Sequence, residues 1–232
     1  MRVRMLSVLP IVVLGFVFLG PAKEMRADTI FTNFGSGQTY SGVSWWDVGT
    51  VTGSANVEVN AFPFVPTQTA LLTGADLALS GLQSPTTPLT VYIETNSGGT
   101  PGTILDTLTQ SGSYSAYPTT GVVNFTCSGS CTTLDAGTTY WIVGQQTDPA
   151  NLAYWMYSDS DTGTWYYNYL NSATGPWTAA DSNNISAFDV TGAGAPPAVP
   201  EPASLALLGS GMVLVGFLEA RRRAWLAKYG DR

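Results

Sequence analysis

The chain has 232 residues, a formal net charge of −7 at pH 7 and no histidine. All nine Lys and Arg residues lie within its first 26 or last 12 positions, whereas thirteen Asp and Glu residues lie between Asp28 and Leu218. This distribution excludes nucleic acid as a partner, because the central part has no cation that could neutralise phosphates, and it disfavours polyanionic sugars.

The first 27 residues have the pattern of a secretory signal peptide. Two arginines precede a mostly apolar segment over residues 5–19. Cleavage is expected after Ala22 or Ala27, and Ala27 is favoured because a strand-like segment starts at Asp28. An uncleaved, helical membrane anchor is the alternative. We therefore expect an exported domain that begins at residue 28.

Residues 28–191 consist of short apolar segments separated by Gly, Pro, Ser, Thr, Asn and Asp. Apolar and polar side chains alternate over 89–94, as in a half-buried strand, and the turn over 97–102 predicts an antiparallel return. The segment 139–145 is expected to form a strand, and residues 140–143 are apolar on both of its faces, which predicts a central strand. The spacing predicts an all-β domain built as an antiparallel two-sheet sandwich of the jelly-roll kind.

Cys127 and Cys131 are the two cysteines of the chain. In an oxidising compartment they are expected to form a disulfide across the short intervening loop. So short a loop yields a stabilisation of about 2 kcal/mol, enough to fix one turn. A metal or redox dithiol is the less favoured alternative, because a zinc site needs four ligands and the chain has no histidine. We expect no metal and no cofactor.

An aromatic-rich region spans residues 154–177. Its alternating rings predict two strands whose side chains cover the core. The alternative is a platform on which neutral sugar rings stack. Its candidate residues are Trp155, Tyr157, Trp165, Tyr167 and Trp177. Between the two strands, Asp159 and Asp161 would suit calcium, but the full ligand pattern is missing and an ordinary acidic turn is favoured.

The C-terminus has four successive parts. They are a linker rich in Pro, Ala and Gly over 192–199, the motif Pro200-Glu201-Pro202, an apolar helix over 203–218, and the cluster Arg221-Arg222-Arg223 followed by a tail over 224–232. The helix would be roughly 24 Å long at 1.5 Å per residue, so it spans a hydrocarbon core of about 30 Å only marginally. The arginines are expected in the cytoplasm and the domain outside it.

The segment VPEPASLALLGSGMVLVGFLEARRR resembles the PEP-CTERM sorting signal of Gram-negative bacteria. The resemblance implies that residues 200–223 form a sorting signal, anchored transiently in the inner membrane. It also implies that an exosortase recognises Pro200, Glu201 and Pro202 and cleaves the tail. Proteins with this signal usually occur in bacteria that make exopolysaccharide, which is therefore a possible partner. The tail over 224–232 departs from the family, which commonly stops at the arginines.

Three phrases of the body are similar to the choice-of-anchor extracellular domains that occur with this signal. They are DTIFTNFGSGQTY, NSGGTPGTIL and LDAGTTYWIVG. The biochemical activity of those domains is generally unassigned, and none of the phrases is catalytic. The likeness implies an extracellular domain and gives no reaction.

We do not expect an enzyme. The exported domain lacks His, Lys and Arg, which removes the commonest general base, Schiff-base amine and anion clamp. Paired carboxylates could hydrolyse glycosides, but the scattered acids single out no pair. We predict a cell-envelope or extracellular-matrix protein of structural or adhesive role, located at the cell surface or released after processing. A neutral-carbohydrate-binding module is the alternative, and exposure of the aromatic face would distinguish the two.

Overall fold

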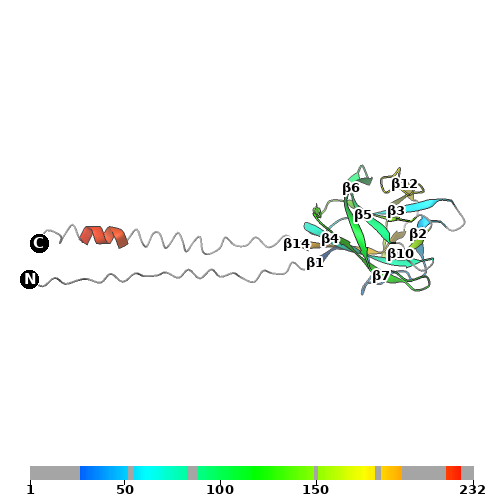
Figure 1. Cartoon of the computed structure of the whole chain (residues 1–232), viewed down its shortest axis with the longest axis horizontal. Helices are drawn as coiled ribbons and strands as arrows, with labels where there is room; N and C mark the ends of the chain where they lie inside the picture. The colour runs from blue at the N-terminus through cyan, green and yellow to red at the C-terminus, as the bar shows by residue number, and fades with distance from the viewer. Residues whose placement is uncertain are drawn as a thin grey trace, which may run out of the picture.

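The computed structural model describes residues 27–51, 55–82, 88–148, 151–180, 184–194 and 218–225. Within this part of the chain it contains fourteen strands and one short helix over 218–225 (Figure 1). The strands are β1 Ala27–Thr32, β2 Trp45–Thr50, β3 Val57–Phe64, β4 Ala70–Gly81, β5 Leu89–Ser97, β6 Thr100–Ser111, β7 Gly121–Cys127, β8 Thr133–Leu134, β9 Tyr140–Gln146, β10 Leu152–Thr162, β11 Trp165–Asn168, β12 Thr178–Ala180, β13 Asn184–Ser186 and β14 Phe188–Gly194. The prediction of an all-β domain is confirmed.

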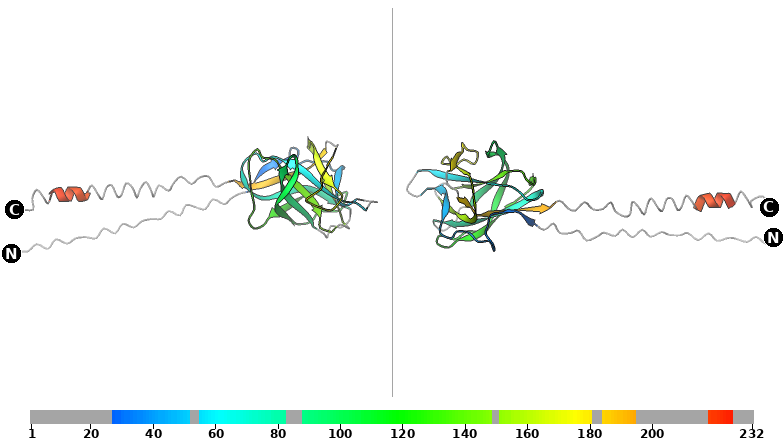
Figure 2. Two further views of the ribbon diagram at one scale, coloured as in Figure 1. Left: turned by 90° about the horizontal axis from the view of Figure 1, so that it is seen from above. Right: turned by 180° about the vertical axis from the view of Figure 1, so that it is seen from behind.

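Eight of the strands close into a barrel. Hydrogen-bonded neighbours follow the order β4-β7-β6-β5-β9-β3-β2-β10, and β10 pairs again with β4. All eight pairings are antiparallel. The predicted jelly-roll-like sandwich of two sheets is therefore wrong (Figure 2). Strands of a sandwich and of a barrel both bury one face, so their side-chain alternation is the same and only the pairing of strand edges separates the two folds.

The largest buried cluster fills the inside of the barrel. Every strand of the ring contributes to it, for example through Val48, Phe62, Leu77, Val91, Leu108, Phe125, Ile142 and Trp155. Two smaller clusters lie on the outer face, one around Tyr154 and Met156 and the other around Trp141 and Val143. Burial of apolar surface on both faces replaces the internal ion pairs that residues 27–194, which include no Lys, Arg or His, cannot form.

The hairpin of β5 and β6 confirms the predicted antiparallel return. Its turn is shorter than expected, because Gly98 and Gly99 adopt φ angles of 65° and 95° and β6 already starts at Thr100. Glycine accepts these positive φ angles without a steric penalty. The predicted central strand is also confirmed, since β9 lies between β5 and β3.

At two places where the barrel closes, a strand edge is shared between a strand of the ring and a strand outside it. The edge of β4 pairs with β14 over residues 70–77 and with β10 over residues 79–81. The edge of β3 pairs with β2 over residues 57–58 and with β11 over residues 59–61. We call these places the β4 fork and the β3 fork. The barrel closes at each fork through only two or three residue pairs, so additional strands can branch outward there.

A buried asparagine holds the β4 fork together. Asn33 is 4% exposed; its Nδ2 donates to the carbonyl of Ser186 at 2.9 Å, and its Oδ1 accepts from the backbone N–H of Phe188 at 2.8 Å. Close by, Trp155 Nε1 donates to the carbonyl of Ala187 at 3.0 Å. These bonds satisfy the backbone at the point where the chain passes from β13 to β14.

The two ends of the barrel domain lie side by side. β1 pairs antiparallel with β14, and Ala27 faces Ala193 (Figure 1). β14 continues to Gly194, so the first three residues assigned to the linker belong to the sheet. The predicted signal peptide up to residue 26, the rest of the linker and residues 200–217 lie outside the described residues.

Candidate functional site

An aromatic pocket lies at the β3 fork. Its lining consists of Trp46, Glu58, Trp165, Tyr167, Tyr169, Ala179 and Ala180, and its volume is about 280 Å³. It therefore combines residues of β2, β3, β11 and β12 with one residue that follows β11. Because β2 separates from β3 beyond residue 58 and β11 pairs with β3 there instead, the fork leaves room between the two branches.

Strand alternation places the aromatic rings of the pocket. On β11, Trp165 and Tyr167 point to the side of the barrel interior, whereas Tyr166 packs in the outer cluster with Trp141. On β2, Trp46 shares the face of the buried core residue Val48. Opposite faces of one strand thus supply the pocket and the outer surface.

The rings form a continuous row. The centroid distances are 4.3 Å between Trp46 and Trp165, 5.6 Å between Trp165 and Tyr167, and 5.1 Å between Tyr167 and Tyr169. The ring centroid of Tyr157 also lies 5.0 Å from that of Trp46. Tyr169 is 44% exposed, so the row leads from the core to the surface. Such a row offers flat apolar faces to a ligand that enters from solvent.

Glu58 is the carboxylate of the pocket. It is 8% exposed, and burial, followed by the nearby charge of Asp47, raises its pKa to about 7. A hydrogen bond from Asn60 opposes this rise. Burial and then the charge of Glu58 also raise the pKa of Tyr157, to about 12, and that of Tyr169. Residues 27–194 contain no Lys, Arg or His that could neutralise the carboxylate.

The pocket also has a hydrogen-bond donor without a partner. Trp165 is 2% exposed, and its Nε1 makes no hydrogen bond. By contrast, Nε1 of Trp46 donates to the carbonyl of Asn184 at 3.0 Å. A buried N–H group without a partner is rare and unfavourable, so this ring lowers the stability of the fold at the pocket.

Two of the five predicted sugar-stacking residues line the pocket, namely Trp165 and Tyr167. Tyr157 lies next to it against Trp46. Trp155 is fully buried inside the barrel, and Trp177 packs in the outer cluster, so neither reaches the pocket. The structure thus divides the predicted platform among three places.

Sequence reasoning missed Trp46, Glu58 and Tyr169. The signal for Glu58 was present in the segment VEVNAFPF of β3, where Glu58 and Asn60 occupy the same face as Phe62 and Phe64. A polar pair on a core-facing register marks a place where the core ends or a site begins. Trp46 is distant in sequence from the other rings, and no local pattern connects it to them.

A second carboxylate, Glu94, is buried away from the pocket. It is fully buried on β5, and neither carboxylate oxygen has a hydrogen-bond partner. Burial raises its pKa to about 8, which means that the protonated form is favoured at neutral pH. We therefore expect Glu94 to make the free energy of unfolding of the barrel depend on pH.

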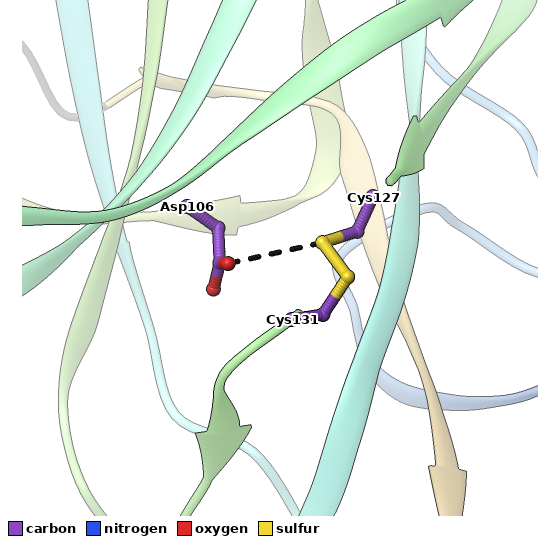
Figure 3. Close-up of side chains that lie close together, drawn as sticks. All are labelled: Asp106, Cys127 and Cys131. Atoms are coloured by element: carbon purple, nitrogen blue, oxygen red, sulfur yellow. Dashed lines mark hydrogen bonds between the residues drawn. A yellow bond between two sulfur atoms is a disulfide. The ribbon is translucent and has the colours of Figure 1, made fainter. Parts of the chain in front are cut away.

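Cys127 and Cys131 lie beside Asp106 (Figure 3). Their sulfur atoms are bonded, with the Cα atoms 6.2 Å apart, and Sγ of Cys127 lies 3.8 Å from Oδ1 of Asp106. Oδ2 of Asp106 accepts from the backbone N–H of Thr132 at 3.1 Å. Among the described residues these three form the group whose ligand atoms are close enough for a metal ion. Bonded sulfurs offer no thiolate, so the arrangement matches a structural bridge better than a metal site.

The disulfide in the exported protein stays a prediction, with a direct chemical test. Alkylation of the purified, unreduced protein is expected to leave its mass unchanged, and reduction is expected to allow two alkyl groups to be added. The double variant Cys127→Ser, Cys131→Ser is expected to lower the free energy of unfolding by about 2 kcal/mol, because the bridge closes a short loop. Mass spectrometry and urea unfolding measure the two effects, and alkylation without prior reduction would contradict the bridge.

Asp159 and Asp161 lie near the end of β10. The backbone N–H of Asp161 donates to Oγ of Ser158 at 3.0 Å, and Oγ of Ser160 donates to the carbonyl of Asn33 at 2.9 Å. In the described part of the chain the two carboxylates belong to no group of three ligand atoms close enough for a metal ion. The segment is the irregular end of a strand held against Asn33.

Of the predicted sorting residues, only the arginine cluster falls in the described part. Arg221, Arg222 and Arg223 lie on the exposed helix over 218–225. Pro200, Glu201 and Pro202 lie outside the described residues, as does the predicted membrane-spanning helix up to residue 217. Among the helices that are described, none is long and apolar enough to cross a membrane.

Comparison with known proteins identifies one segment. The model of the PEP-CTERM protein-sorting motif matches residues 198–223. The predicted sorting signal is thereby confirmed, and it marks the protein as an exported substrate of an exosortase. No curated protein matches the chain. No solved structure matches it either, so the likeness of the body to choice-of-anchor domains has no support from a relative.

Proposed function

We propose that the protein is an adhesive component of the cell envelope or extracellular matrix, and that it binds polysaccharide without negative charge in the aromatic pocket. The observation that carries this proposal is the row of rings from Trp46 to Tyr169. The apolar faces of sugar rings stack on such aromatic surfaces. The acidic barrel, which lacks any cation between residues 27 and 194, disfavours acidic sugars.

The position of the pocket supports an adhesive role. In Figure 1 the strands β2, β3 and β12 lie at the end of the barrel opposite to β1 and β14, and Figure 2 agrees. The sorting signal follows β14 in the chain. The strands β2, β3 and β12, which contribute to the pocket, therefore lie far from the end of the barrel from which the chain continues to the signal. After processing by the exosortase the pocket is free to hold exopolysaccharide.

We propose that binding occurs without catalysis. Glycoside hydrolysis usually needs two carboxyl groups on either side of the scissile bond. Glu58 lines the pocket, whereas Asp47 alternates with Trp46 on β2 and is not part of the lining. A single carboxylate beside stacked rings can orient a sugar, but it lacks the partner for acid and base steps.

Tyr169→Ala is expected to weaken polysaccharide binding about tenfold, the equivalent of about 1.4 kcal/mol, because it removes the outermost stacking ring. Isothermal titration of the full-length protein with exopolysaccharide from the producing cells, and with unsubstituted, acetylated and amine-bearing glucans, measures the effect. Tyr117→Ala is the matched control, because Tyr117 is similarly exposed, at 41%, but lies outside the pocket.

The expected result is a loss in Tyr169→Ala and unchanged binding in Tyr117→Ala. An equal loss in both variants would place binding elsewhere on the surface. If the folded protein gave no heat with any of these polysaccharides, the proposed function would be wrong.

A further inference from the structure

The buried carboxylate of Glu58 has no positive partner in the protein. It is 8% exposed, and its charged neighbour is the acidic Asp47. No basic residue occurs between residues 27 and 194. Buried charges in proteins are paired, because an unpaired charge in an apolar surrounding is costly. In the free protein Glu58 avoids this cost by keeping its proton up to near-neutral pH, and a cationic ligand in the pocket would supply the counter-charge that lets it ionise.

The rings around Glu58 favour the same kind of ligand. Trp46, Trp165 and Tyr167 line the pocket with centroid spacings of 4.3 Å and 5.6 Å. The negative faces of tryptophan and tyrosine rings attract a cation within about 6 Å, and the attraction grows when the cation is desolvated. An ammonium group in the pocket would gain from the rings and from the carboxylate together.

The rings and Glu58 set two requirements for the ligand. The rings offer flat apolar faces to C–H groups, and the carboxyl group offers acceptor oxygens to an ammonium group. A simple amine covers little of the flat faces, and an uncharged sugar brings no counter-charge to Glu58. A sugar that carries an amine meets both requirements.

We propose that the pocket binds a sugar unit with a free, protonated amine, that is, a hexosamine unit of a partly deacetylated polysaccharide. This inference rests on the proposed polysaccharide binding and narrows its ligand. The volume of about 280 Å³ lies near the lower end of small-molecule pockets, which suits one sugar ring rather than a long segment of chain. The ammonium group lies toward Glu58 and the ring stacks on the aromatic row.

The test uses tryptophan fluorescence titration of the full-length protein at a pH just below neutrality. The probes are oligosaccharides of glucose, of N-acetylglucosamine and of glucosamine, and methylammonium as an amine without a sugar. The variants are Glu58→Gln, which keeps the shape of the side chain and removes its charge, and Asp135→Asn. Asp135 is an exposed carboxylate next to β8, at the end of β4 that pairs with the last residues of β14. Its removal controls for general attraction of cations to an acidic protein.

The glucosamine oligomer is expected to bind the native protein at least about tenfold more tightly than its acetylated form, a difference typical of one cation pairing with rings and a carboxylate. Glu58→Gln is expected to abolish this preference while binding of the uncharged oligomers persists. Asp135→Asn is expected to keep it. A melting temperature of Glu58→Gln that is equal to that of the native protein at pH 4.5, and not lower near neutrality, verifies its fold, because glutamine resembles the protonated carboxyl group and cannot ionise.

Equal binding of all three oligomers, or a preference that survives in Glu58→Gln, overturns the hexosamine inference and leaves polysaccharide binding intact. If methylammonium binds as tightly as the glucosamine oligomer, the sugar ring contributes nothing, and both the inference and the proposed function fail. Failure of every probe to bind the folded protein also overturns both.

Discussion

The barrel is expected to lose stability as the pH rises from about 4.5 to about 8. Burial raises the pKa of Glu94 to about 8 and that of Glu58 to about 7, from an ordinary value of 4.5, and raises that of Asp189 from 3.8 to about 7. A carboxyl group with a higher pKa in the folded state holds its proton more tightly there. Its contribution to stability is complete below the unfolded pKa and is lost as the pH rises through the folded pKa. All three groups act in the same direction.

Glu94 is expected to make the largest contribution to this loss. When the pKa of a group is one unit higher in the folded than in the unfolded state, the free energy of unfolding changes by about 1.4 kcal/mol. The raised pKa of Glu94 is therefore expected to lower the free energy of unfolding at pH 8 by on the order of 4 kcal/mol relative to pH 4.5. Glu94→Gln is expected to recover most of that energy at pH 8 and to have almost no effect at pH 4.5. Urea unfolding followed by tryptophan fluorescence at both pH values measures the difference.

Asp159→Asn is the control for this experiment, because Asp159 is exposed. Its removal is expected to change the free energy of unfolding by less than about 0.5 kcal/mol at either pH. A stability that does not depend on pH over this range would contradict the role of the buried carboxyl groups. If the free energy of unfolding changed with pH in Glu94→Gln as it does in the native protein, Glu94 would not be the source of the pH dependence.

Asn33→Ala is expected to lower the free energy of unfolding by about 3 kcal/mol. The asparagine side chain is almost fully buried and bonds to the carbonyl of Ser186 and the N–H of Phe188 at the β4 fork. Alanine leaves both backbone groups buried without a partner, and water has no access to replace the amide. Thermal and urea unfolding measure the loss.

Asn124→Ala is the matched control for the β4 fork. Asn124 is exposed and donates to Oδ1 of Asp76 at 2.9 Å on the surface of the barrel. Since water can replace this bond, the expected loss is below about 0.5 kcal/mol. If Asn33→Ala cost no more than Asn124→Ala, the fork would be held by strand pairing alone.

The aromatic pocket shows what the alternation of side chains along a strand can predict and what it cannot. Alternation along β11 predicted that Trp165 and Tyr167 share a face, and both line the pocket. The same reasoning grouped them with Trp155, which fills the barrel interior, and with Trp177, which packs on the outer face. Alternation gives the side of a strand and does not give the position of that strand in the barrel.

The placement of Glu58 in the pocket depends on pairing between strands that are distant in sequence. Glu58 stands on the core-facing register of β3, a polar residue among phenylalanines, and this signal was readable in the sequence. That it lines an aromatic pocket follows only from β11 pairing with residues 59–61 of β3 while β2 turns away. Residues far apart in the chain create the space, and no local periodicity reports it.

Composition and short motifs by themselves determined that this protein is exported, sorted and built of antiparallel strands. Charge, targeting segments and the alternation of apolar and polar side chains are properties of single segments. They can therefore be recognised in the sequence without knowledge of tertiary contacts. The tertiary structure alone decided that the strands close into a barrel and that additional strands branch from it at the β4 fork and the β3 fork. It also decided that Glu58 lies beside the row of aromatic rings at the β3 fork. Edge pairing between distant segments depends on the free energy of the whole sheet, and many pairings are compatible with the same alternation.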